Sequence, residues 1–197
     1  MRGFLMGLAV VAGVIAVILL SLGGMYNSLV SSEEKVKESW AQVENVYQRR
    51  LDLIPNLVQT VKGYAAHERQ TLDSVVQARA SIGQMKIGAD VVNNPEALAQ
   101  FEKAQAGLSG ALSRLLLVAE QYPNLKANEN FLALQTQLEG TENRITVERR
   151  RFNEMSREFN VKIRIFPSNV LAGMMGFREK AYFQADEGAK AVPKVSF

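Results

Sequence analysis

Residues 122–159 read YPNLKANENFLALQTQLEGTENRITVERRRFNEMSREF, and this stretch decides the fold. Its first part is rich in Asn and contains Pro123, which cannot continue a preceding helix, so a turn is expected there. From Phe131 onward apolar residues recur every seven positions, at Phe131, Leu138, Ile145, Phe152 and Phe159. A helix with so long an apolar stripe needs other helices to cover it, because the stripe alone buries nothing.

Matching helical patterns lie on both sides of a loop at residues 83–95. Apolar residues step by threes and fours from Val36 to Ile82 and again from Leu98 to Tyr122. Asn94 and Pro95, which open the second pattern, are typical of an N-cap and a first helical turn. No segment alternates apolar with polar residues, so the sequence predicts an all-α protein.

Helix lengths favour an antiparallel up-and-down bundle. At ~1.5 Å per residue, segments 27–53, 56–82 and 96–121 each reach ~40 Å, and segment 129–165 reaches ~55 Å. This arrangement requires the chain to reverse near Pro55, at 83–95 and at 123–128. Pro55 favours a break because it lacks the helical donor and its ring crowds the carbonyl of Leu51.

A second arrangement is one continuous helix from Met25 to Ile82, kinked at Pro55. The later helices would then cover only its distal half. An apolar stripe near the membrane would lie bare and would need a partner chain. The stripe consists of Val36, Trp40, Val43 and Tyr47.

Residues 3–25 are predicted to be a transmembrane helix. The stretch from Phe4 to Leu22 is almost wholly apolar and, with its flanks, reaches the ~20 residues that cross ~30 Å of hydrocarbon. A cleaved signal peptide fits less well, because its apolar core is usually ~7–15 residues and no Ala-x-Ala site follows Leu22. Arg2 precedes the span, and the first charges after it are Glu33 and Glu34. This bias places the amino terminus in the cytoplasm and the bundle outside it.

The expected organisation is therefore a transmembrane anchor at 1–25, a helical bundle at 26–180 and a flexible tail at 181–197. The chain has no Cys, which excludes disulfides and thiolate metal sites. Its net charge of +3 is spread over helices where acids and bases alternate, which argues against nucleic-acid binding.

Catalytic and metal-binding patterns are each incomplete. His67 is the only histidine, and Thr71 occupies the position where a His-Glu-x-x-His motif needs its second one. Glu139 and Glu142 have helical spacing, but the histidines of a di-iron bundle site are missing. We interpret these acids as surface carboxylates or as partners of Arg49 and Arg50 across the bundle. The sequence thus predicts no catalytic residue, no cofactor and no metal, and hence no enzyme.

The remaining candidate residues are asparagines. Capping and cross-helix hydrogen bonds are favoured for them over ligand binding, although both explanations remain open. They are Asn124, Asn128 and Asn130 in the Asn-rich turn, with Asn153 and Asn160 on one face of the long helix.

Several motifs resemble those of the LemA family of bacterial membrane-anchored helical proteins. They are YPNLKANENF at 122–131, LQTQLEGTENRI at 134–145, QRRLDLIPNLVQTVKGYAAHE at 48–68 and LSGALSRLL at 108–116. The resemblance covers about 26–183 and implies an all-helical fold with a membrane anchor, but no established reaction. It also implies association with membrane-stress or envelope machinery, including a membrane metalloprotease.

Together these observations predict a single-pass protein of the bacterial inner membrane that contacts the bilayer through residues 3–25. Its expected role is that of a helical scaffold or interaction protein without a catalytic site. The alternative is an accessory subunit, adaptor or substrate of a membrane-bound metalloprotease or another envelope enzyme. A homo-oligomer is expected if the stripe around Trp40 is bare, because apolar surface favours burial at ~25 cal/mol per Å².

Overall fold

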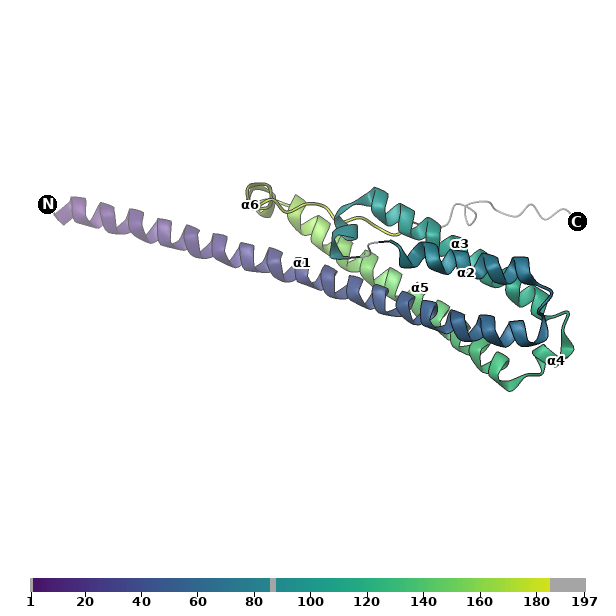
Figure 1. Ribbon diagram of the computed structural model, residues 1–197. Helices are drawn as coiled ribbons and strands as arrows, with labels where there is room; N and C mark the ends of the chain where they lie inside the picture. The colour runs from purple at the N-terminus through teal and green to yellow at the C-terminus, as the bar shows by residue number, and fades with distance from the viewer. Residues whose placement is uncertain (1, 86–87, 185–197) are drawn as a thin grey trace, which may run out of the picture.

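The computed structural model describes residues 2–85 and 88–184, which are mainly helical and contain no strand. The predicted all-α class is confirmed (Figure 1). The elements are α1 (Arg2–Tyr64), α2 (Arg69–Gly83), the 3₁₀ turn η1 (Ala89–Asn93), α3 (Pro95–Ala119), α4 (Pro123–Lys126), α5 (Glu129–Arg164) and α6 (Ser168–Met175).

Helix α1 has a bare half and a covered half. Residues 2–24 are exposed along their whole length, and Figure 1 shows this part projecting alone from the bundle. Among the described residues, α1 is the one helix long and apolar enough to cross a membrane. Met25 is the first partly covered residue, and from there the other helices pack on α1.

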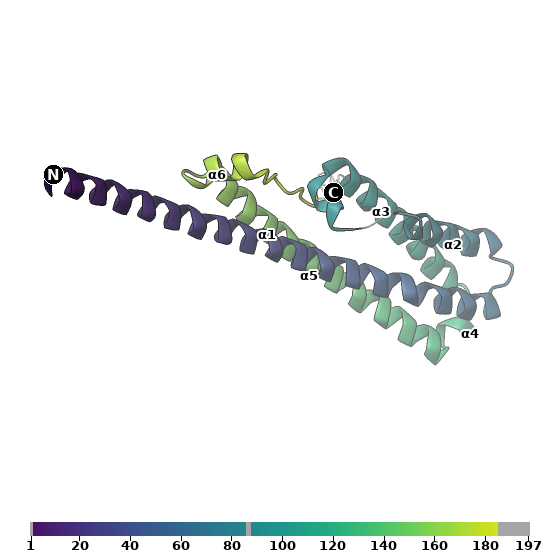
Figure 2. The same cartoon turned by 60° about the vertical axis from the view of Figure 1, so that its left-hand side comes forward.

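The covered half of α1 packs along α5, while α2 packs between α1 and α3. Figures 1 and 2 show α1 and α5 side by side and running in opposite directions. Two groups of buried apolar side chains fill the bundle. The proximal core, nearer the bare half of α1, includes Trp40, Phe152 and Phe159. The distal core, at the other end, includes Ile54 and Leu115.

The predicted reversal at Pro55 is wrong, because α1 continues through this residue to Tyr64. The rival helix from Met25 to Ile82 is also wrong, since the chain turns between α1 and α2. Pro55 lies on the exposed face of α1. The carbonyl of Leu51 has no helical donor, because Pro55 lacks a backbone N–H. It instead accepts a hydrogen bond from Arg79 Nε of α2 at 3.1 Å. A tertiary contact thus replaces the missing bond and lets the helix continue.

Pro55→Ala is therefore expected to raise the melting temperature. The free energy of unfolding should rise by up to the ~3 kcal/mol that separates Ala from Pro inside a helix. Arg79→Met should cost ~1–3 kcal/mol, because the partly buried Leu51 carbonyl loses its donor. The same change should cost much less alongside Pro55→Ala, where the alanine amide donates to that carbonyl. Denaturant unfolding of both single variants and the double variant measures this coupling, and strictly additive effects would contradict it.

The stripe near the membrane is covered within the chain. Val36, Trp40, Val43 and Tyr47 have exposed fractions of 0%, 1%, 0% and 4%. The Trp40 ring contacts Phe101 of α3, Phe152 of α5 and Phe183 beyond α6. Self-association stays a prediction, but this stripe no longer supplies the apolar surface that would drive it.

Candidate interaction site

Residues 177–184 run from α6 back along the bundle in an extended path (Figure 1). Ala181 and Phe183 are buried, with exposed fractions of 7% and 5%, and the Ala181 amide donates to the Val92 carbonyl at 2.8 Å. The packed part of the chain thus extends past the boundary predicted at residue 180. The rest of the predicted tail, 185–197, lies outside the described residues.

Asn160 and Asn153 hold this segment by its backbone. The Asn160 amide donates to the Lys180 carbonyl at 2.9 Å and accepts from the Lys180 amide at 2.7 Å. Asn153 bonds the Phe183 carbonyl and amide in the same way, at 2.9 and 2.8 Å. Seven helical residues rise ~10.5 Å, and three extended residues span ~10 Å. The spacing of the asparagines on α5 therefore matches the spacing of their partners.

Charged side chains also tie residues 177–184 to the bundle. Lys180, only 4% exposed, donates from Nζ to Glu33 Oε1 at 2.6 Å and to Asn93 Oδ1 at 2.7 Å. Arg149 pairs with Glu102 at 2.7 Å and donates to the Gln184 carbonyl at 3.1 Å. Sequence reasoning missed Lys180, which sits in a segment without periodicity, so no local signal marked it as buried.

The structure does not bring the candidate asparagines together. Asn128 is the N-cap of α5: its Oδ1 accepts from the Phe131 amide at 3.0 Å, and its Nδ2 donates to the Tyr64 hydroxyl at 3.0 Å. Asn124 and Asn130 are exposed. From Asn128 to Asn153 the rise along the helix is ~37 Å. The Asn-rich turn and the two backbone-binding asparagines are therefore separate features.

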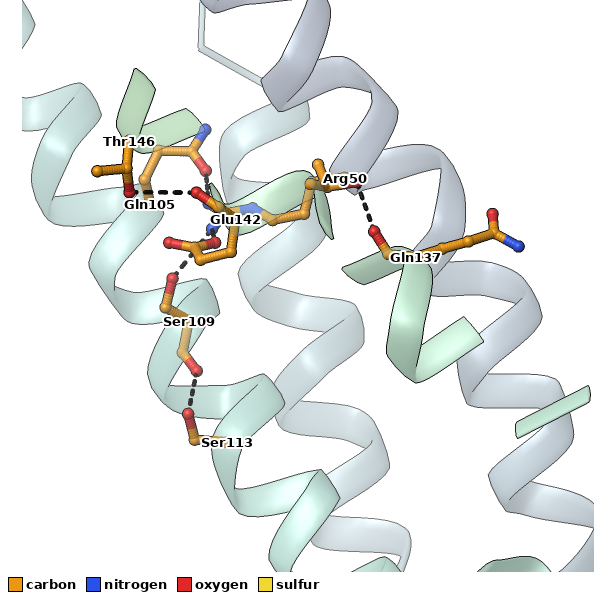
Figure 3. Close-up of polar contacts among 8 residues, drawn as sticks. Arg50, Gln105, Ser109, Ser113, Gln137, Glu142 and Thr146 are labelled. Atoms are coloured by element: carbon orange, nitrogen blue, oxygen red, sulfur yellow. Dashed lines mark hydrogen bonds and ion pairs between the residues drawn. The ribbon is translucent and has the colours of Figure 1, made fainter. Parts of the chain in front are cut away.

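A buried arginine links three helices (Figure 3). Arg50 of α1 is 2% exposed and donates from Nη1 to Ser109 Oγ at 3.0 Å and to Glu142 Oε2 at 2.8 Å. Its Nη2 donates to Gln105 of α3. The expectation that Glu142 would pair with an arginine across the bundle is confirmed. Burial also raises the pKa of the nearby Tyr47 hydroxyl, an effect that Arg149 and Arg50 partly oppose.

Beside Arg50 an open groove runs between α3 and α5. Because α3 packs mainly on α2 and α5 mainly on α1, these two helices leave a gap at this face. One hollow of about 320 Å³ adjoins another of about 380 Å³. We call the pair the α3–α5 groove. It is lined by Arg50, Ser109, Leu112, Ser113, Leu116, Leu117, Ala119, Glu120, Lys126, Phe131, Gln135, Leu138, Glu139 and Glu142.

The groove has apolar walls, and Arg50 is buried beside them. Leu112, Leu116 and Leu138 supply apolar wall. Arg50 Nε and the neighbouring Gln105 Nε2 are buried without a hydrogen-bond partner among the described residues. Buried donors of this kind normally have an acceptor. These two donors are closed off from the groove, so its walls offer a ligand apolar contact.

Within residues 2–85 and 88–184, no three His, Cys, Asp or Glu side chains are placed to hold a metal ion. His67 lies exposed in the turn between α1 and α2.

Comparison with known proteins gives a family match and several relatives. A sequence model of the LemA family matches residues 39–197. Magnetosome proteins MamQ 1 and MamQ 2 of Paramagnetospirillum magneticum are each 29% identical over 178 residues, covering 81% of this chain and 64% of the relative. Protein LemA of Metamycoplasma hominis is 25% identical over 164 residues, covering 83% of this chain and 71% of the relative. The chain therefore spans less than two thirds of the magnetosome relatives.

Proposed function

Because this chain belongs to the LemA family, we propose that it is a membrane-anchored scaffold whose α3–α5 groove binds a helix of a partner protein. The groove carries this proposal, since it is a long recess with apolar walls beside a buried cation. The apolar half of α1 supports a membrane localisation. The scaffold has no catalytic step of its own and acts by holding its partner close to the bilayer.

An amphipathic helix suits this groove better than a small molecule. Such helices lay their apolar face into a groove between other helices and are held by anchors on successive turns. Leu112 and Leu116 line it at the helical spacing that such anchors contact, and the partly exposed Leu117 extends the wall. We therefore infer a partner helix with apolar anchors.

The proposed orientation has the amino terminus in the cytoplasm and the bundle outside the inner membrane. It is supported by Arg2 before the apolar half of α1 and by Glu33 and Glu34 after it. The alternative function, an accessory subunit, adaptor or substrate of a membrane-bound metalloprotease or another envelope enzyme, differs only in the identity of the partner.

Single cysteines test the groove and the orientation together, because the natural chain has no Cys. Ser113→Cys lies in the groove, and Gln77→Cys on the exposed face of α2 is the matched control. A photoactivatable maleimide that cannot cross membranes is added to intact spheroplasts and then illuminated. We expect both cysteines to react, but only the groove position to give a discrete crosslinked species. Adding Leu116→Glu should abolish that species.

Failure of both cysteines to react would contradict the orientation. Equal crosslinking from both positions, or none from the groove, would contradict docking there. Identification of a metalloprotease subunit in the crosslinked species would favour the adaptor alternative over a free-standing scaffold.

A further inference from the structure

A charge-free apolar stretch near the carboxyl end has no role in the proposed groove. Residues 165–177 read IFPSNVLAGMMGF and are flanked directly by Arg164 and Arg178. Helix α6, inside this stretch, buries Leu171 and Ala172. Most of its large apolar side chains face outward, with exposed fractions of 53% for Ile165, 82% for Phe166, 56% for Val170, 77% for Met174 and 56% for Met175. Contiguous apolar surface of this kind usually marks a protein or membrane contact.

The position of α6 indicates which contact this is. Figures 1 and 2 show α6 at the end of the bundle from which the bare half of α1 emerges. The ring of Phe177, just after α6, lies 6.2 Å from the ring of Tyr26, and Met25 packs against the same proximal core as Leu171. Helix α6 therefore lies beside the first covered turn of α1.

The length of α1 then sets the depth of α6 relative to a bilayer. Its bare part, residues 2–24, extends ~34 Å and so fills a hydrocarbon core of ~30 Å. Met25 and Tyr26 would lie at the edge of that core. The uncharged part of α1 continues to Ser32, which matches the further depth of a headgroup layer. Helix α6 would thus lie at the boundary between headgroups and acyl chains.

We propose that α6 and the preceding loop insert into the membrane surface and give the bundle a second contact with phospholipid beside α1. Val170 and Met174 are four residues apart on α6 and form an exposed apolar ridge, and Phe166 is exposed in the loop before the helix. Interfacial helices bury such a ridge at the acyl boundary while neighbouring basic residues meet anionic headgroups. Arg164 and Arg178 are placed for this, although Glu179 approaches Arg164 at 3.7 Å.

Two membrane contacts would fix the bundle in a way that one cannot. A bundle joined to the bilayer through α1 alone could rotate about that helix. With α6 inserted as well, one side of the bundle faces the lipid, and the α3–α5 groove, which extends to the distal end at Lys126, is held away from the surface. The lipid contact therefore fixes where a partner can approach.

Collision accessibility of a spin label tests the contact in the full-length chain. Single cysteines replace Phe166, Val170 or Met174, and the labelled protein is placed in vesicles of phosphatidylethanolamine and phosphatidylglycerol. Leu132→Cys is the control, because Leu132 is also apolar and 47% exposed but lies on α5 near the distal end. We expect oxygen to collide more often than a water-soluble nickel chelate at these three positions, and the reverse at the control.

A second variant separates insertion from folding. Phe166→Asp with Met174→Asp alters exposed side chains, so helicity should be unchanged while the label at Val170 becomes accessible to nickel. Water accessibility at positions 166, 170 and 174 equal to that at Leu132 would overturn the proposal. Shielding from both reagents that rises with the protein-to-lipid ratio would also overturn it, because a second copy would then cover the patch. Neither outcome depends on what binds the α3–α5 groove.

Discussion

Trp40→Lys is expected to unfold the proximal core. The indole is 1% exposed and lies 5.8 and 5.4 Å from the rings of Phe101 and Phe152, with Phe183 stacked on it at 5.9 Å. Loss of a buried Trp side chain alone costs ~3–5 kcal/mol, and a buried, unpaired lysine adds a further desolvation cost. Together these approach the ~5–15 kcal/mol that holds a typical domain folded.

Circular dichroism of the full-length chain in mild detergent measures this effect. The control is Gln42→Lys, because Gln42 is exposed on the same stretch of α1 and should accept a lysine with little change in melting temperature. A folded Trp40→Lys protein with an unchanged melting temperature would mean that the stripe around Trp40 is an interface between chains, as in the continuous-helix arrangement.

Local signals in the sequence located most of the helices. The pattern at 96–121 became α3, and Asn94 is its N-cap, with Oδ1 accepting from the amides of Glu96 and Ala97. The pattern at 129–165 became α5, which begins one residue after its cap Asn128. These predictions succeeded because caps, first-turn prolines and apolar periodicity act within a few residues of the element they define.

Tertiary contacts decided what the sequence could not show. Pro55 meets every local condition for a helix break, but Arg79, 28 residues after Leu51, supplies the donor that the Leu51 carbonyl lacks. Residues 177–184 have no helical period. Their packing on the bundle could not be predicted from local sequence, because it depends on Asn153 and Asn160 of α5. For the same reason the sequence left the cover of Trp40 undecided, since Phe183 comes from that segment. The sequence predicted only part of the Arg50 cluster. Glu142 was a candidate partner of the arginine, but Gln105 was not, because it occupies an otherwise apolar face of α3.

Asn160→Leu is expected to release residues 177–184 from the bundle. Asn160 is 3% exposed. Its side-chain Nδ2 donates to the Lys180 carbonyl and the Tyr182 hydroxyl, and its Oδ1 accepts from the backbone amide of Lys180. Leucine has nearly the same size but makes none of these hydrogen bonds. Each buried polar group left without a partner costs ~1–3 kcal/mol, so the total should reach several kcal/mol. The Lys180 ammonium would then lose its position between Glu33 and Asn93 as well.

Hydrogen exchange at the Lys180 and Phe183 amides reports the release directly, because both are bonded to asparagine side chains of α5. Asn160→Asp should have an intermediate effect, since it keeps the acceptor for the Lys180 amide and loses the donor for the carbonyl. Asn143→Leu is the matched control on an exposed face of α5 and should leave exchange unchanged. If Asn160→Leu also leaves exchange at both amides unchanged, the asparagine is not what holds the segment, and packing of Phe183 on Trp40 must hold it instead.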